Sequence, residues 1–281
     1  MVELKSFENG FEYLELKNDA ASAKIALQGA HVFEYKYSDS QDVFWLSENS
    51  AFELGSAIRG GVPLCWPAFG LNNPDLPQHG FARTSLFELV SSKELGENAT
   101  EVVLRLRDSK ESLELWNHKF ELEFKVRVSD TLTMELKTTN LDANEFKLTQ
   151  ALHSYFRVSE ISDAVVKGLK SKPRFDALTN KTFIQKEDIS FKEEFDSVFQ
   201  EVDAEIILED ADARLSVKNE GSSSVVVWNP WLDKCSRMSA MKPTAYREFV
   251  CVESANAFED FKILRPNETH ILKATILKQL S

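Results

Sequence analysis

One histidine in the sequence has neighbours that suit acid–base chemistry. In FKLTQALHSYF (residues 146–156), strand alternation places His153 opposite Leu148 and Leu152, on a face with polar and small residues. Imidazole is the side chain that gains or loses a proton near neutral pH. A catalytic histidine and an ordinary hydrogen-bonded surface histidine both fit this position.

A glutamate at the end of an apolar run is the matching candidate base. Glu253 follows four consecutive apolar residues in FVCVESAN (249–256), and such a run is typical of a strand buried on both faces. Partial burial would raise the pKa of this carboxyl toward the range of a general base. The alternative is a strand-end glutamate that faces water or caps a turn.

Two irregular segments carry polar groups that could bind a ligand. LPQHGFAR supplies Gln78, His79 and Arg83, and RGGVPLCWPAFG begins with Arg59. The glycines and prolines of the second segment predict a stiff loop, neither a helix nor a strand interior. Amide, imidazole and guanidinium groups together suit a hydroxyl-rich or phosphorylated ligand. An ordinary polar loop and a hairpin connection around a core tryptophan are the alternatives.

The elements that would position these residues read as strands. Period-two alternation runs through 119–128 and 131–137 around the turn Ser129-Asp130 and predicts an antiparallel hairpin. Further short alternating runs occur at 12–17, 32–37, 101–107, 213–219, 224–229, 247–253 and 270–277. Residues 111–118 predict a short helix, and 180–197 a long charged connection. We therefore expect an all-β protein, one large antiparallel β-sandwich domain spanning residues 1–281.

Composition excludes several classes of partner. The net charge of −12 disfavours nucleic acid and anionic membranes, and an anionic ligand would need a local basic pocket. We find neither a signal-peptide pattern at the N-terminus nor an apolar run of about 18 residues, so a cytoplasmic protein is expected. The three cysteines form no CxxC pair, and their spacing indicates neither a metal site nor a disulfide framework.

Five segments, in this order, resemble a known family. IRGGVPLCWPAFG, QHGFAR, LTQALHSYFRVS, VVVWNPW and CVESAN are similar to the aldose 1-epimerase superfamily, most closely its glucose-6-phosphate 1-epimerase branch, the hexose-6-phosphate mutarotases. The resemblance spans nearly the whole chain. It implies a galactose mutarotase-like β-sandwich with a sugar site on its concave face, His153 as catalytic acid, Glu253 as catalytic base, and His79 near the sugar ring.

The resemblance also implies a substrate-binding set. Arg59, Gln78 and Arg83 match positions that hold the substrate, with the arginines on its phosphate. Asp196 in FDSVF matches a family aspartate, although a phenylalanine stands three residues later where tyrosine is common, so Asp203 is an alternative. No cofactor or metal is implied, and we expect a monomer whose partner is a small hexose phosphate, with neither nucleic acid nor a membrane involved.

The implied reaction interconverts α and β anomers by acid–base ring opening and closure, for which one acid and one base suffice. Two other functions remain open: a non-catalytic sugar-phosphate sensor and a mutarotase of neutral aldoses. A glycoside hydrolase is disfavoured because that chemistry generally uses two carboxylates, although Asp196 is a second candidate carboxylate.

Overall fold

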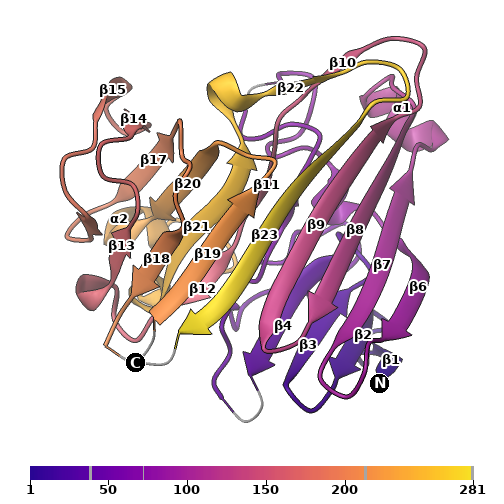
Figure 1. The fold of residues 1–281 in the computed structure, drawn as a ribbon, viewed down its shortest axis with the longest axis horizontal. Helices are drawn as coiled ribbons and strands as arrows, with labels where there is room; N and C mark the ends of the chain where they lie inside the picture. The colour runs from indigo at the N-terminus through magenta and orange to yellow at the C-terminus, as the bar shows by residue number, and fades with distance from the viewer. Residues whose placement is uncertain (38–39, 72, 212–213, 280–281) are drawn as a thin grey trace.

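The structure, a computed structural model, describes residues 1–37, 40–71, 73–211 and 214–279. Within these residues the strands form two large antiparallel sheets, a smaller N-terminal sheet and a two-stranded ribbon (Figure 1). One large apolar core contains side chains from both large sheets and from the N-terminal sheet. The expected fold class, a large antiparallel β-sandwich, is confirmed.

The first large sheet, called here the β23 sheet, contains the strongest alternation of the sequence. Its burial alternates residue by residue in β8 and β9, whose register pairs Phe124 with Leu136 across the turn at Ser129-Asp130. The predicted hairpin is therefore confirmed. In spatial order the sheet contains β16 (Ile189–Ser190), β13 (Val165–Lys167), β18 (Ile206–Glu209), β19 (Arg214–Glu220), β23 (Thr269–Gln279), β9 (Thr131–Asn140), β8 (Phe120–Val128), β7 (Thr100–Arg107) and β6 (Glu88–Glu94).

The second large sheet, the β21 sheet, lies against the first. In spatial order it contains β15 (Lys181–Ile184), β14 (Pro173–Asp176), β17 (Phe195–Phe199), β20 (Ser224–Asn229), β21 (Phe249–Asn256), β11 (Gln150–Leu152) and β5 (Leu64–Cys65), with β12 (Tyr155–Arg157) also paired to β21. Every residue of β21 is buried, as the apolar run predicts. Val250 and Val252 point into the large core, so Cys251 and Glu253, which alternate with them, point to the opposite face.

The segment predicted as a stiff loop joins the N-terminal sheet to the β21 sheet. Val62 bridges Val32 in the N-terminal sheet, and Leu64 pairs with Leu152 as part of β5, a short strand that the sequence did not predict. Trp66 is fully buried and its indole N–H donates to Thr138, so this tryptophan is a core residue. The N-terminal sheet consists of β1 (Val2–Ser6), β2 (Glu12–Lys17), β3 (Ala21–Ala26) and β4 (His31–Tyr37).

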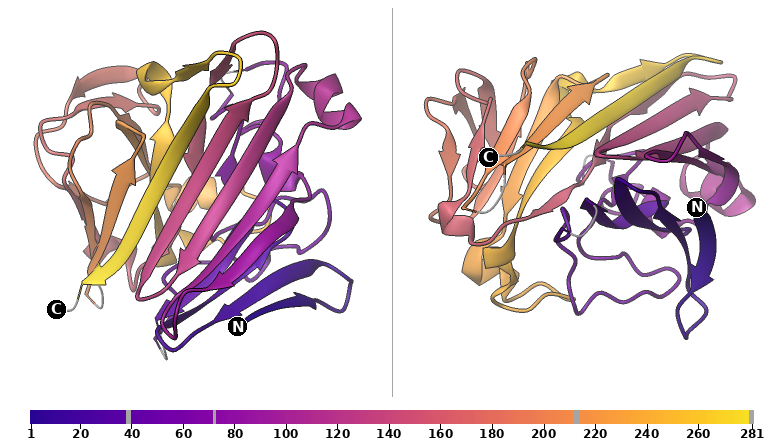
Figure 2. Two further views of the ribbon diagram at one scale, coloured as in Figure 1. Left: turned by 45° about the vertical axis from the view of Figure 1, so that its right-hand side comes forward. Right: turned by 60° about the horizontal axis from the view of Figure 1, so that its bottom comes forward.

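The remaining elements connect the sheets at their ends. Figure 2 shows the short helices at the periphery of the sheets. The ribbon pairs β10 (Phe146–Leu148) with β22 (Lys262–Leu264), and the helical segments are α1 (Lys110–Leu115), α2 (Trp231–Cys235) and the 3₁₀ turns η1 (Ala82–Thr84), η2 (Ile161–Asp163), η3 (Ala245–Glu248) and η4 (Phe258–Asp260). None of the helices in the described part of the chain has the length and apolarity that a membrane crossing needs.

Two sequence expectations need correction. Residues 180–197 are not one long connection, because β15, β16 and the start of β17 form within them and pair with neighbouring strands. Residues 146–156 are not one strand either. They divide into β10, β11 and the start of β12, because the three pieces pair with different partners, and His153 lies in the gap between β11 and β12. Except for β15, which pairs with the adjacent β14 across residues 177–180, these strands pair with strands that are distant in sequence, and local alternation carries no signal of such partners.

Two glycine substitutions test how closely the loop before η1 packs against Trp66. Gly80 has a positive φ of 71°, and a Cβ there would lie 2.0 Å from the carbonyl oxygen of Trp66. Gly10 has a similar φ of 81° with open space around it. We predict that Gly10→Ala lowers the free energy of unfolding by about 1 kcal/mol through backbone strain, and Gly80→Ala by about 3 kcal/mol or more because of the added clash. Denaturant unfolding measures both, and equal losses would contradict this packing.

Candidate active site

Glu253 lies in the middle of β21, on the face that points away from the large core. Its carboxyl sits between two apolar clusters of that face, because Cys251 precedes it and Ala255 follows it on the same side of the strand. The aromatic cluster contains Trp45, Tyr155, Trp228, Cys235, Met241, Ala245, Phe249 and Cys251. The small-residue cluster contains Cys65, Phe69, Ala151, Val198, Val226, Ala255 and Ala257. Glu253 is only 2% exposed, so the strand-end alternative is wrong.

Burial sets the protonation of this carboxyl. Loss of water around Glu253 raises its pKa well above the ordinary 4.5, and the negative charge of Asp196 raises it further. One carboxyl oxygen, Oε1, lies 3.4 Å from Nε2 of His153. The other, Oε2, is buried without a hydrogen-bond partner among the described residues. A buried carboxyl with one unsatisfied oxygen is costly for stability, and such groups are typical of sites that bind or react.

His153 is held against Glu253 by aromatic packing. Its ring stacks on Tyr155 with centroids 4.8 Å apart and an angle of 10°, and meets Trp228 edge to face at 6.0 Å. Burial lowers the pKa of His153 well below 6.5; a proton on His79 and the charges of Arg59 and Arg83 lower it further. Burial therefore favours the neutral form of each group, an uncharged His153 imidazole and a protonated Glu253 carboxyl.

His79 is a neutral neighbour of this pair. Its ring centroid lies 5.6 Å from that of His153, and its Nδ1 accepts a hydrogen bond from the backbone N–H of Gly70 at 3.2 Å. Because Nδ1 is the acceptor, Nε2 carries the proton. Burial, followed by the charges of Arg83 and Arg59, lowers the pKa of His79 to about 4. At neutral pH this side chain therefore offers an N–H donor.

Two arginines bring positive charge to the site. A guanidinium nitrogen of Arg59 donates to the hydroxyl of Tyr155 at 3.3 Å, and Arg83 donates to the backbone carbonyl of Gln78 at 2.7 Å. Both charges lower the pKa values of His79 and His153, which places both guanidinium groups near the histidines. Gln78 lies in the loop before η1 and is exposed.

Of the two candidate aspartates, the structure brings only Asp196 to the site. Asp196 lies on β17 opposite Trp228 of β20 and approaches the Lys234 ammonium at 3.4 Å. Burial raises its pKa, and its charge acts on Glu253. Asp203 is paired with Lys172 on the surface, with its side chain 83% exposed.

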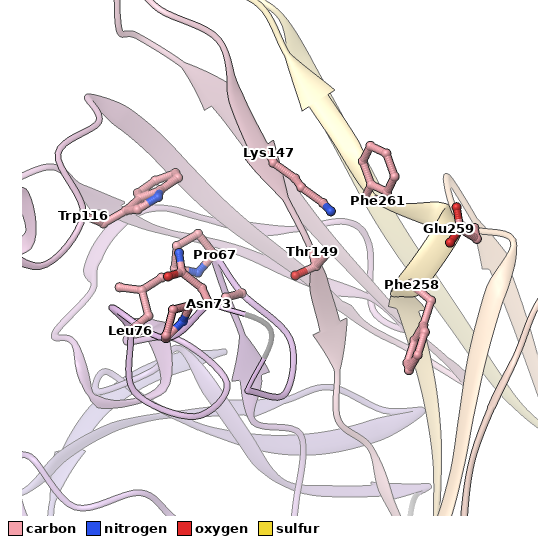
Figure 3. A pocket seen from close by; sticks show the side chains of 11 residues that line it. Pro67, Asn73, Leu76, Trp116, Lys147, Thr149, Phe258, Glu259 and Phe261 are labelled. Carbon is pink, nitrogen blue, oxygen red and sulfur yellow. The ribbon is translucent and has the colours of Figure 1, made fainter. Parts of the chain in front are cut away.

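A separate cavity of about 410 Å³ lies beside the site. Figure 3 shows Lys147 and Thr149 on one side of it and Asn73 and Leu76 on the other. It is bounded by Thr149, whose hydroxyl accepts from the Phe69 N–H, and neither His153 nor Glu253 lines it. This cavity is therefore distinct from the His153–Glu253 pair, which we take as the centre of the candidate site.

Comparison with known proteins identifies the family of this chain. The sequence profile of the family described as aldose 1-epimerase covers residues 12–276. This chain belongs to the aldose 1-epimerase family. Over 261 residues it is 35% identical to an Escherichia coli (strain K12) family member provisionally named glucose-6-phosphate 1-epimerase, which covers 90% of this chain and 85% of that protein. The resemblance identified from the five segments is therefore confirmed.

Solved structures of the family share the fold. The crystal structure of a provisionally assigned mutarotase (YeaD) from Salmonella typhimurium superposes with a TM-score of 0.92 at 30% identity, covering 100% of this chain and 94% of that chain. Galactose 1-epimerase from Lactobacillus acidophilus NCFM superposes with a TM-score of 0.77 at 13% identity, covering 99% and 98%. At that identity the second likeness concerns the fold alone.

Three residues of the site were not singled out from the sequence. Tyr155 shares the face of His153 by alternation, which is a signal that the sequence contained. Cys251 lies two residues before Glu253 on the same face of one strand, which is also a local signal, whereas Lys234 lies in α2 after β20 and reaches Asp196 only through the fold.

The neutral state of His79 can be measured directly. We predict that the imidazole C–H resonances of His79 titrate with a pKa of about 4, and that Arg83→Met raises this pKa because it removes a positive charge beside the ring. NMR of the histidine rings between pH 3 and about 8 makes the measurement. Arg247→Met, which removes a surface arginine paired with Glu160, is the control and leaves the pKa unchanged. Titration of wild-type His79 near 6.5 would contradict the assigned burial.

Proposed function

We propose that this protein interconverts the α and β anomers of hexose 6-phosphates, with His153 as acid and Glu253 as base. The supporting observation is the pair itself, whose nearest nitrogen and oxygen lie 3.4 Å apart and whose pKa values are shifted by burial, that of Glu253 upward and that of His153 downward. An acid and a base that exchange one proton are what ring opening and closure require.

The proposed reaction proceeds in two balanced stages. Glu253 takes the proton of the anomeric hydroxyl while His153 gives a proton to the ring oxygen, and the bond between the anomeric carbon and the ring oxygen breaks. The open-chain aldehyde rotates about its C1–C2 bond. Ring closure from the other face returns the proton from Glu253 to the new hydroxyl, and His153 recovers its proton from the attacking hydroxyl.

The phosphate supports this assignment of roles through electrostatics. Burial is the largest cause of the low pKa of His153, and the charges of Arg59 and Arg83 add to it. A phosphate dianion bound between these guanidinium groups would offset their charge and raise the pKa of His153. We propose that the proton of Glu253 then moves to His153, so that the pair becomes the carboxylate base and imidazolium acid of the mechanism.

Other proposed contacts follow from position. The Gln78 amide and the His79 Nε2–H offer hydrogen bonds to sugar hydroxyls, and Asp196 offers an acceptor on the opposite side of Glu253. The higher-identity relative reported above has a glucose-6-phosphate name, whereas the galactose 1-epimerase shares 13% identity. Both points favour a phosphorylated hexose over a neutral aldose.

The pair is tested by exchange NMR of glucose 6-phosphate anomers. We predict that wild type accelerates exchange, and that Glu253→Gln and His153→Asn each reduce the rate by about 10²–10⁴-fold, the usual contribution of one positioned acid or base. Glu259→Gln and His118→Asn, which lie outside the pair, serve as matched controls and retain the rate. Full activity in either pair variant would refute the assignment. Substrate binding without any acceleration in wild type would favour the sensor function.

The phosphate is tested separately by comparing two sugars. We predict that Arg59→Ala and Arg83→Ala, each alone, lower kcat/KM for glucose 6-phosphate by about ten- to hundredfold more than for glucose, because each removes a charge-assisted contact. Arg247→Ala is the control. Equal losses for both sugars would show that the arginines do not bind the phosphate, and faster turnover of glucose by wild type would favour the neutral-aldose function.

A further inference from the structure

We propose that His153, Cys251 and Glu253 form a binding site for a thiophilic divalent metal ion such as Zn²⁺, and that the bound ion inhibits the enzyme. The site rests on the geometry of these three side chains alone. Only the inhibitory effect rests on the proposed function.

The three side chains present their donor atoms to one another. A ring nitrogen of His153, the sulfur of Cys251 and a carboxylate oxygen of Glu253 all lie within 4.8 Å of one another, and all three residues are buried. In a tetrahedral zinc site, bonds of about 2.0–2.3 Å place ligand atoms roughly 3.3–3.6 Å apart. The His153–Glu253 separation of 3.4 Å already meets this requirement. The thiol needs to approach by about 1 Å, within the reach of a side-chain rotation.

The backbone holds two of the ligands in place. Cys251 and Glu253 are two residues apart on β21, so both point to the same face of a strand that is paired on both sides. His153 is fixed by its stacking on Tyr155. A site on such a preorganised strand loses little conformational freedom when it binds an ion.

Unpartnered donor atoms are a second, independent observation. His153 Nδ1 and Glu253 Oε2 are both buried without a hydrogen-bond partner among the described residues. Glu253 Oε2 is an unused acceptor, so a carboxylate that binds an ion through this oxygen, or through both, gains a partner that the described residues do not supply. When Nε2 of His153 binds the ion, Nδ1 keeps the ring proton and gains no partner from it.

The ligand set defines the class of metal. Thiolate and imidazole ligands favour Zn²⁺ and similar ions over Mg²⁺ and Ca²⁺, which prefer oxygen ligands. Three protein ligands leave the fourth tetrahedral position for a water. Binding releases the thiol proton of Cys251 and the proton of the His153–Glu253 pair into solvent.

Some charged residues around the cluster favour a bound cation and others oppose it. Asp196 attracts a cation to the site, and its charge already acts on both Cys251 and Glu253. Arg59 and Arg83 oppose the cation and favour the phosphate of a substrate. An ion at this position occupies the lone pairs that the proposed reaction uses to move its proton. Zinc and the phosphorylated sugar therefore exclude each other.

Direct metal binding tests the site without any enzyme assay. We expect wild type to bind one equivalent of Zn²⁺ by calorimetry at this site, and its Co²⁺ adduct to show a thiolate-to-metal charge-transfer band. Cys251→Ser and Glu253→Gln should each weaken Zn²⁺ binding at least about tenfold, and Cys251→Ser should abolish the band. Cys65→Ser is the matched control, because this buried cysteine lies near Glu253 but outside the cluster, and it should retain both signals.

Several outcomes would overturn the site. These are unchanged Zn²⁺ affinity in Cys251→Ser, a band that persists in that variant, or a band that Cys65→Ser removes. Zinc X-ray absorption on wild type needs no variant, and it must show one sulfur ligand at about 2.3 Å. In the exchange assay, Zn²⁺ should slow wild type and Cys65→Ser at concentrations that fill the site. Metal binding without any exchange activity would refute the proposed function and leave the site intact.

Discussion

The site depends on one constraint, a carboxyl group buried in the middle of a central strand. Strand alternation directs Val250 and Val252 into the core and forces Glu253 onto the opposite face, between the two apolar clusters. Water is excluded there, so the charged carboxylate is disfavoured and its pKa rises. His153 is the group beside it that can exchange the proton, and the rest of the site acts through this pair.

The loops around the pair control its charge. Residues 59–70 connect the N-terminal sheet to the β21 sheet. This connection lets Arg59 donate a hydrogen bond to Tyr155, against which His153 stacks. The loop before η1 brings in His79 and η1 itself brings in Arg83, with Gly80 packed against the Trp66 carbonyl. The positive charges of Arg59 and Arg83 add to the lowering of the pKa of His153, and the negative charge of Asp196 adds to the raising of the pKa of Glu253.

Local patterns in the sequence predicted the strands well and the site partly. Alternation over 119–137 located the β8–β9 hairpin, and the apolar run before Glu253 predicted a doubly buried strand, because both signals are local. The breaks in 146–156 depend on distant partners and were missed, and so were the strands within 180–197, of which β15 pairs with the adjacent β14 and the others with strands farther away in the chain. Spacing likewise indicated no metal ligands, because Cys251 meets His153 only through the pairing of β12 with β21. The choice between Asp196 and Asp203 also required the fold, which brings Asp196 near Glu253 and leaves Asp203 on the surface.

The protonation state of Glu253 tests this account most directly. Carbon-13 NMR of the glutamate carboxyls, with Glu253→Gln to assign the resonance, follows its titration before and after substrate is added. The account predicts a pKa well above 4.5, and movement of the proton from Glu253 to His153 when glucose 6-phosphate binds. A Glu253 carboxyl that titrates at its ordinary value, or a proton that stays on it in the complex, would contradict the account.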